Sequence, residues 1–217
     1  MANIPIPMTP ELYRYCETVG FREPPLLQEL RTFMETHPQS HMQVSPDVGQ
    51  LLAFLVRLTR PKTILEVGTF VGYSTLSMAL ELGENGKIIT CDRDPTLPSL
   101  GEPFWEKSGR RAQIDFKLGS ALETLSDLSD QNFTCDMIFI DADKNAYDQY
   151  YEYGLLFLPP GGLMVIDNVL WRGEVAHETR DPTVTSLRKF NEKIHKDPRV
   201  FPLLIPISDG VTVLVKK

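Results

Sequence analysis

From residue 62 to residue 170 the chain alternates short apolar runs with segments of helical pattern. The runs are KTILEVGTF, KIITCDRD, AQIDFKLGS, CDMIFIDA and GGLMVIDN, and four segments of helical spacing separate them, one of them over residues 100–111. Parallel strands need this order, because each connection must return to the same end of the sheet. The sequence therefore predicts an α/β fold, with a mostly parallel sheet that is covered by helices on both faces.

The two ends of the chain depart from this alternation. Three helical patterns come first, and the earliest has Thr9 as its N-cap, Pro10 in its first turn and Gly20 at its end. The end of the chain, PLLIPISDGVTVLVKK, has two β-rich runs joined around an Asp-Gly pair, which predicts an antiparallel hairpin. We expect a single domain over residues 1–217, with N-terminal helices in 1–60 and an α/β core in 61–217. Residues 173–186 are polar and predict a long loop.

The composition excludes several classes of protein. Of the 217 residues, 42% are hydrophobic and 24% are charged, and the net charge of -7 argues against a nucleic-acid partner. The three cysteines show no spacing typical of a disulfide framework or a zinc site, which favours a reducing compartment. No segment has the pattern of a secretory leader or a membrane span. We expect a cytoplasmic protein that binds neither nucleic acid nor membrane.

Polar residues follow the first two strands of the predicted sheet, where ligands bind in open α/β folds. Glu66 lies on the first strand, Gly68 and Gly72 frame the turn, and Ser74 opens the next helix. The spacing Gly-x-x-x-Gly is not the Gly-x-Gly-x-x-Gly of dinucleotide sites, so it favours a nucleoside cofactor without a pyrophosphate. Asp92 ends the second strand, where a ribose-binding carboxylate would stand. The alternative is a tight turn with a solvated acid.

Two later strands end on oxygen-bearing side chains. The run MIFI ends on Asp141, with Lys144 three residues on, and LMVI ends on Asp167 and Asn168. If the two strands are neighbours, two carboxylates and an amide meet at one edge, and this set suits a hard cation such as magnesium or calcium. The alternative is purely structural, with a salt bridge between Asp141 and Lys144 and a loop cap at Asp167.

Taken together, the motifs resemble a known family. The stretches HPQSHMQVSPDVGQLLAFL, ILEVGTFVGYSTL, IITCDRDP, IDFKLGSALETL, FIDADKNAY, GGLMVIDNVLWRG and ISDGVTVLVKK follow one another in family order from about residue 37. The chain resembles the cation-dependent, S-adenosylmethionine-dependent O-methyltransferases of the caffeoyl-CoA and catechol type, and is closest to the caffeoyl-CoA branch and its bacterial relatives. DADK, DNVLW and the final DGV are together highly specific.

The resemblance implies a Rossmann-like methyltransferase fold with a seven-stranded sheet, and commonly a homodimer. It also implies roles for residues of this chain. The positions that match those holding S-adenosylmethionine are Met42, Val44, Glu66, Gly68, Ser74, Asp92, Ala121 and Asp141. The positions that match the ligands of a divalent cation, Mg²⁺ first with Ca²⁺ and Mn²⁺ as alternatives, are Asp141, Asp167 and Asn168. Lys144 matches the residue that takes the phenol proton.

The acceptor that the resemblance implies is a catechol-type small molecule, such as a caffeoyl or flavonoid derivative. Trp171 could pack on an aromatic acceptor, although an ordinary half-buried loop aromatic explains it as well. The chain has Asp-Ala-Asp-Lys at residues 141–144 in place of the Asp-His-Trp-Lys of the catechol type, so a catecholamine specificity does not transfer. Two other functions stay open: a catalytically silent, dimeric module that binds the donor, and a nicotinamide-dependent oxidoreductase.

Overall fold

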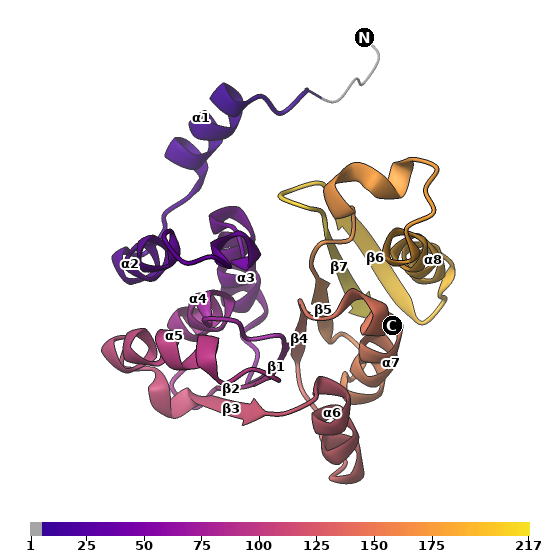
Figure 1. The fold of residues 1–217 in the computed structure, drawn as a ribbon. Helices are drawn as coiled ribbons and strands as arrows, with labels where there is room; N and C mark the ends of the chain where they lie inside the picture. Colours follow the sequence, from indigo (N-terminus) through magenta and orange to yellow (C-terminus); the bar gives the residue numbers. More distant parts are fainter. Residues whose placement is uncertain (1–5) are drawn as a thin grey trace.

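The computed structural model describes residues 6–217, and their seven strands form one sheet in the order β3-β2-β1-β4-β5-β7-β6 (Figure 1). The strands are β1 (Thr63–Val67), β2 (Lys87–Asp92), β3 (Ile114–Leu118), β4 (Met137–Ile140), β5 (Leu163–Ile166), β6 (Val200–Ile205) and β7 (Val211–Lys216). The first five are parallel, while β7 runs antiparallel to both β5 and β6. The predicted α/β class and the closing hairpin are both confirmed.

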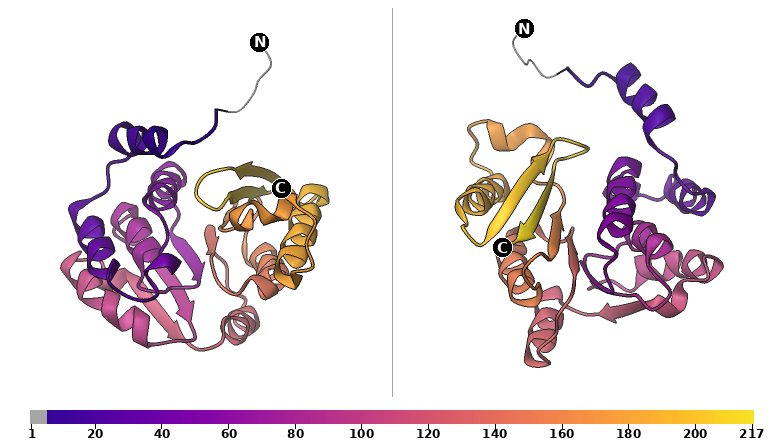
Figure 2. Two further views of the ribbon diagram at one scale, coloured as in Figure 1. Left: turned by 45° about the horizontal axis from the view of Figure 1, so that its top comes forward. Right: turned by 180° about the vertical axis from the view of Figure 1, so that it is seen from behind.

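Helices cover both faces of the sheet (Figure 2). The α-helices are α1 (Pro10–Gly20), α2 (Pro25–Met34), α3 (Pro46–Thr59), α4 (Tyr73–Glu81), α5 (Thr96–Lys107), α6 (Ala121–Asp130), α7 (Tyr147–Phe157) and α8 (Pro182–Lys196). Four 3₁₀ segments join them: η1 (Ser40–Met42), η2 (Arg111–Gln113), η3 (Lys144–Ala146) and η4 (Trp171–Ala176). Side chains of α6, α7 and α8 share one buried cluster, and those of α2 to α5 share the other.

The central strands β4 and β5 are apolar along their whole length because both of their faces are covered. On β1, Leu65 and Val67 belong to the cluster of α6 to α8, while Ile64 belongs to the cluster on the opposite face. Every residue of β4 and β5 is buried. The edge strand differs, since Phe201 and Leu203 on β6 are 70% and 58% exposed. The central strands thus form a rigid base whose carboxyl ends carry the polar residues.

Two sequence predictions were wrong in their boundaries. The helix predicted over residues 100–111 begins at Thr96, where the Asp94 carboxylate accepts the Thr96 N–H, and it ends at Lys107. The loop predicted over 173–186 is shorter, because α8 already begins at Pro182. Asp181 caps that helix by accepting the Thr183 N–H over 2.7 Å. The Asp-Pro pair is the same kind of start signal that predicts α1, although it lies within a polar stretch.

The N-terminal helix α1 stands apart from the rest of the described chain (Figures 1 and 2). Its predicted cap is confirmed, since Thr9 Oγ1 accepts the Leu12 N–H over 3.2 Å. None of its residues is buried, and the large side chains of Tyr15 and Val19 are exposed. Among residues 6–217 no helix has the length and apolar character that crossing a bilayer requires.

Candidate active site

The polar residues predicted to form a site lie at one edge of the sheet. Val67 on β1 pairs with Cys91 on β2 and with Ile140 on β4, and Ile140 pairs in turn with Ile166 on β5. Because these strands are parallel, the residues that follow them emerge side by side. The condition set by the sequence, that the strands before Asp141 and Asp167 be neighbours, is fulfilled.

Glu66 is a fully buried carboxyl group on the central strand β1. Ser74 Oγ donates to its Oε1 over 2.6 Å, and the Thr75 hydroxyl donates to its Oε2. Burial raises the pKa of Glu66 to about 7, although the two hydroxyl hydrogen bonds oppose this shift. These two hydroxyls link the first turn of α4 to β1. In this structure the Ser74 hydroxyl is therefore a hydrogen-bond partner of Glu66.

The turn after β1 is built on glycines. Gly68 has a φ of 99°, and a Cβ at this residue would lie 2.0 Å from the carbonyl oxygen of Asp141. Gly72 has a φ of 73°, and a Cβ there would lie 2.3 Å from the Trp105 ring. Glycine is needed at both positions because of the conformation and because of close packing within the protein. The turn is therefore fixed before any ligand arrives.

Asp92 holds the same turn from the neighbouring strand. Its Oδ2 accepts the backbone N–H groups of Thr69 and Phe70 over 3.1 and 2.9 Å, and its Oδ1 accepts the N–H of Asp94 over 3.1 Å. A carboxylate can accept about four hydrogen bonds, so one position stays open for a ligand hydroxyl. The structure thus shows the tight turn of the structural alternative, and the ribose-binding role of Asp92 stays a prediction.

Asp141, Asp167 and Asn168 supply oxygen atoms at the ends of β4 and β5. Asp167 is buried, and its Oδ1 accepts the N–H of Asn168 over 2.7 Å. Burial, followed by the negative charge of Asp141, raises the pKa of Asp167 to about 7. Asn168 has a φ of 56°, a conformation that asparagine tolerates better than most residues. Within residues 6–217 no three His, Cys, Asp or Glu side chains are grouped as metal ligands, and this set has two carboxylates and an amide.

Lys144 lies between the two strand ends. Its Nζ donates to Asp141 Oδ1 over 2.8 Å and to the Tyr147 hydroxyl over 2.7 Å. The Tyr147 hydroxyl donates in turn to the carbonyl oxygen of Asp167 over 3.0 Å. Burial raises the pKa of Tyr147 well above its ordinary value. The structural alternative is thus also observed, since Lys144 pairs with Asp141 and Asp167 accepts the N–H of Asn168. Both carboxylates still lie at the edge of the sheet.

Tyr147 belongs to this group, and its role was not predicted from the sequence. It ends the motif FIDADKNAY, three residues after Lys144, and the helical spacing of these two residues was the available signal. An aromatic residue at the start of a helix is usually interpreted as part of the hydrophobic core. Tyr147 is indeed buried in the cluster of α6 to α8.

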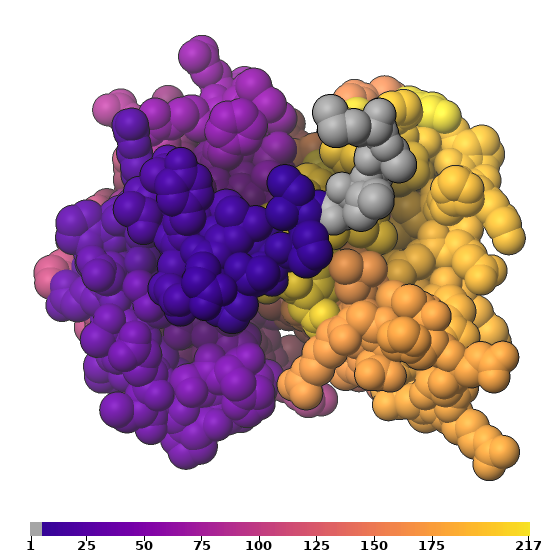
Figure 3. Space-filling model, turned by 90° about the horizontal axis from the view of Figure 1, so that it is seen from above, coloured from indigo at the N-terminus to yellow at the C-terminus, as the bar shows by residue number. Residues whose placement is uncertain are grey.

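The other predicted site residues lie in connecting segments. Met42 ends η1 and is exposed, while Val44 packs against the cluster of α2 to α5. Ala121 begins α6, and Trp171 begins η4; both pack partly buried against the opposite cluster. Seen from above, a hollow separates the N-terminal helices from the orange and yellow C-terminal segments (Figure 3). The roles of these four residues stay predictions.

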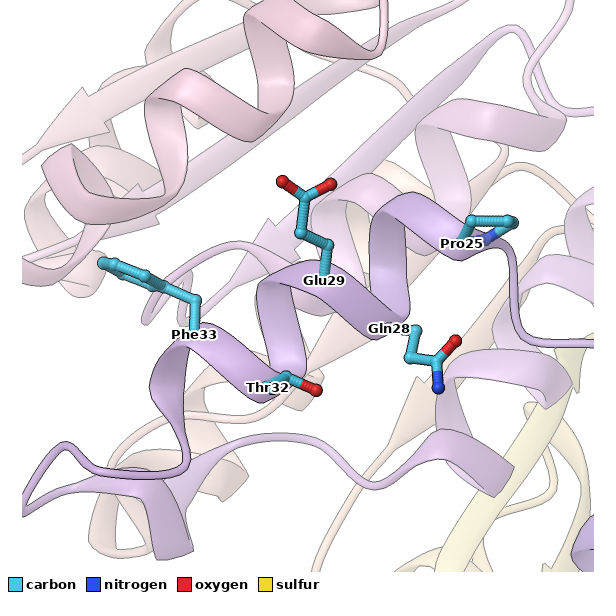
Figure 4. Close-up of a pocket in the computed structure, with 5 residues that line it drawn as sticks. All are labelled: Pro25, Gln28, Glu29, Thr32 and Phe33. Atoms are coloured by element: carbon cyan, nitrogen blue, oxygen red, sulfur yellow. The ribbon is translucent and has the colours of Figure 1, made fainter.

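A second hollow lies on the surface of α2. Its lining side chains, from Pro25 to Phe33, all belong to that helix, and they include the carboxylate of Glu29 (Figure 4). Glu29 accepts a hydrogen bond from Lys107 on α5 over 2.5 Å. None of the predicted site residues lines this hollow, so it does not compete with the strand ends as the active site.

Comparison with known proteins decides between the methyltransferase and the oxidoreductase. The sequence profile described as O-methyltransferase matches residues 17–217. The chain belongs to the O-methyltransferase family. The predicted resemblance and the predicted enzyme class are therefore confirmed, and the nicotinamide-dependent alternative is excluded.

Individual members of the O-methyltransferase family align along nearly the whole chain. Catechol O-methyltransferase domain-containing protein 1 of Mus musculus is 40% identical, covering 94% of this chain and 79% of the mouse protein. Caffeoyl-CoA O-methyltransferase 1 of Arabidopsis thaliana is 36% identical, covering 94% of this chain and 83% of the plant protein. The SAH-bound methyltransferase of Podospora anserina has a similar structure, with a TM-score of 0.88, 28% identity and 99% of each chain covered. The methyltransferase fold is thereby confirmed.

Proposed function

We propose that this O-methyltransferase moves a methyl group from S-adenosylmethionine to one hydroxyl of a catechol-type acceptor, with a divalent cation at the ends of β4 and β5. One observation carries the proposal: the residues after two paired parallel strands, Asp141 and Asp167, emerge side by side, and Lys144 donates to Asp141. The kinship with caffeoyl-CoA and catechol-type proteins supports the class of acceptor.

The methyl donor would bind at the turn between β1 and α4. Gly68 lets this turn pack against the main chain of Asp141, and Asp92 would keep one acceptor position for a ribose hydroxyl. Met42, Val44, Ser74 and Ala121 are the further residues that we assign to this site, with Glu66 beneath it. The SAH held by the fungal neighbour supports this assignment. The donor supplies the methyl group as an electrophilic carbon bound to sulfur.

The side chains at the ends of β4 and β5 fit a hard divalent cation. Asp141, Asp167 and Asn168 offer only oxygen atoms, which magnesium, calcium and manganese prefer. Two carboxylates on neighbouring strand ends also need a compensating charge, and Lys144 provides one positive charge for the two. Asp141, Asp167 and Asn168 would hold the cation, and its positive charge would favour the phenolate form of a diol bound beside it.

Lys144 would act as the general base of the transfer. In its neutral form, Nζ would take the proton of one phenolic hydroxyl, and the resulting phenolate oxygen would form a bond to the methyl carbon. The bond between that carbon and sulfur breaks in the same displacement, which leaves S-adenosylhomocysteine and an aryl methyl ether. Lys144 then releases the proton to water. Trp171, at the start of η4, is the residue that we place against the aromatic ring of the acceptor.

The test is transfer of labelled methyl from S-adenosylmethionine to a panel of catechols that includes caffeic acid and caffeoyl-CoA. We expect transfer with magnesium and none with a chelator, and relative rates would rank the acceptors. Thermal stabilisation by S-adenosylhomocysteine checks donor binding separately, because ligand binding raises the apparent stability of the native state. Stabilisation without transfer to any acceptor would favour the catalytically silent module instead. Transfer that persists in the chelator would overturn the cation site.

We also propose that the protein is cytoplasmic, that each chain folds as a single methyltransferase domain, and that two chains form a homodimer. The exposed apolar side chains of β6, Phe201 and Leu203, and those of α1, Tyr15 and Val19, support a self-association surface. The net charge of -7 supports the absence of a nucleic-acid partner. Sedimentation equilibrium of the full chain tests the proposal, and a single species at the monomer mass would contradict it.

A further inference from the structure

The hydroxyl of Tyr147 links Lys144 to the main chain of Asp167, at the end of β5. Tyr147 is the first residue of α7 and is buried, so its hydroxyl has no access to bulk water. The oxygen accepts a hydrogen bond from Lys144 Nζ over 2.7 Å, and the hydrogen is donated to the carbonyl oxygen of Asp167 over 3.0 Å. Because its hydrogen is committed to Asp167, the phenol can only accept from Lys144.

Lys144 has a defined set of partners as a result. Its side chain is 11% exposed, and its Nζ donates to Asp141 Oδ1 over 2.8 Å and to the Tyr147 oxygen. These two acceptors stand on different elements, the end of β4 and the start of α7. Together they therefore fix the place and the direction of Nζ.

We propose that Tyr147 is a positioning residue that holds Lys144 Nζ at the place from which it meets the hydroxyl of the acceptor. The inference rests on the proposed function, in which Lys144 takes the phenolic proton. Asp141 alone would leave Nζ free to rotate about one hydrogen bond, and the Tyr147 oxygen removes this freedom. Tyr147 touches neither the acceptor nor the donor in this role, so it acts only through Lys144.

The same helix contains an internal control. Tyr151 lies one turn further along α7, is also buried, and stacks edge-on against Phe190 with a centroid distance of 5.8 Å. Tyr147 packs against the same ring at 5.7 Å. The Tyr151 hydroxyl donates to Asp197 Oδ2 over 2.9 Å and does not contact Lys144. The two tyrosines thus share their burial and packing and differ in the group that the hydroxyl holds.

The first experiment compares Tyr147→Phe with Tyr151→Phe in the magnesium-dependent transfer assay, using the best acceptor of the catechol panel. We expect Tyr147→Phe to lower kcat about 10- to 100-fold, because a misdirected base loses most of its contribution. The KM for S-adenosylmethionine should stay within about twofold of its original value, since uniform binding is unaffected. Tyr151→Phe should leave kcat within about twofold. Equal kcat values in the two variants would overturn the proposal.

A second experiment needs no turnover. Reductive methylation with formaldehyde, followed by mass spectrometry, reports how freely each lysine amine reacts. We expect Lys144 to be modified several times faster in Tyr147→Phe than in the unaltered protein or in Tyr151→Phe, with the exposed Lys196 as the reference amine. Unchanged modification of Lys144 would contradict the positioning role. If the unaltered protein transfers no methyl group, the proposed function fails, while this experiment still decides whether Tyr147 holds Lys144.

Discussion

The backbone of Gly68 lies directly against the carbonyl oxygen of Asp141, so closely that a Cβ at residue 68 would be 2.0 Å from it. Gly68 belongs to the turn assigned to the methyl donor, and Asp141 to the proposed cation site. The two halves of the candidate site are therefore in contact through main-chain atoms, before any ligand is bound.

Replacing Gly68 by alanine should destabilise the protein strongly. A matched control is Gly109→Ala, because Gly109 also has a positive φ, of 71°, but a Cβ added there would meet nothing within 4 Å beyond its chain neighbours. The control should cost about 1–2 kcal/mol for the left-handed conformation alone. Gly68→Ala should cost roughly 1–3 kcal/mol more, because backbone must move to make room. Urea denaturation measures both, and equal losses would mean that the close contact does not constrain the turn.

The buried carboxyl of Glu66 should make the stability of the ligand-free protein depend on pH. Its pKa is raised from 4.5 to about 7 by burial, so the folded state favours the protonated form. This contribution is fully present below pH 4.5 and is lost as pH rises through 7, by up to roughly 3 kcal/mol. Glu66→Gln should remove this part of the decline. Unfolding free energies at about pH 5 and about pH 8 give the comparison, and parallel profiles for the two proteins would contradict it.

Asp197 should produce a dependence of the opposite sign. Its carboxylate accepts from Arg199 Nη2 over 2.6 Å and from the Tyr151 hydroxyl over 2.9 Å, and the bonds from Arg199 hold its pKa well below the usual range. The stability that this gives is present above about pH 4 and is lost as pH falls toward the lowered pKa. Asp197→Asn should cost about 1–2 kcal/mol at about pH 7 and much less at about pH 3. An equal loss at both pH values in chemical denaturation would rule out the charge as the cause.

Asn168 offers a test of the cation site that does not depend on activity. If its amide oxygen is a ligand, Asn168→Ala should weaken the binding of Mn²⁺ by roughly 10- to 100-fold. The binding of S-adenosylhomocysteine should change little. Asn145→Ala is the control, because Asn145 is exposed beside the site and its side chain bonds to Asp143. Titration calorimetry with Mn²⁺ measures the effect, and equal affinities for the two variants would remove Asn168 from the site.

The strand ends were predictable because their signals are local. An apolar run that stops on a carboxylate defines the end of a buried strand, and parallel pairing then brings such ends together. Asp92, Asp141 and Asp167 could thus be assigned to one sheet edge from the sequence. Whether β4 and β5 were neighbours depends on strand order, which is a property of tertiary packing and entered the prediction as a condition.

The features that were missed depend on contacts between distant segments. The bond from Tyr147 to the carbonyl of Asp167 joins residues 20 apart, and no pattern of side chains encodes a main-chain acceptor. The glycine spacing favours a nucleoside cofactor, whereas Gly72 packs against Trp105 of α5. The start of α8 is an exception, because it has a local signal in Asp181 and Pro182 that lies within a polar stretch.

The segment η4, which begins at the proposed acceptor residue Trp171, is tied down mostly through its own main chain. The Arg188 guanidinium donates to the carbonyl oxygens of Val175 and His177, and the N–H of Arg172 donates to Asp209. Every residue type has a backbone carbonyl, and every type except proline has a backbone N–H. The exposed side chains of this segment, such as those of Glu174 and Ala176, can therefore be exchanged while its path is kept. Point substitutions there could change the surroundings of Trp171 without a change of the backbone.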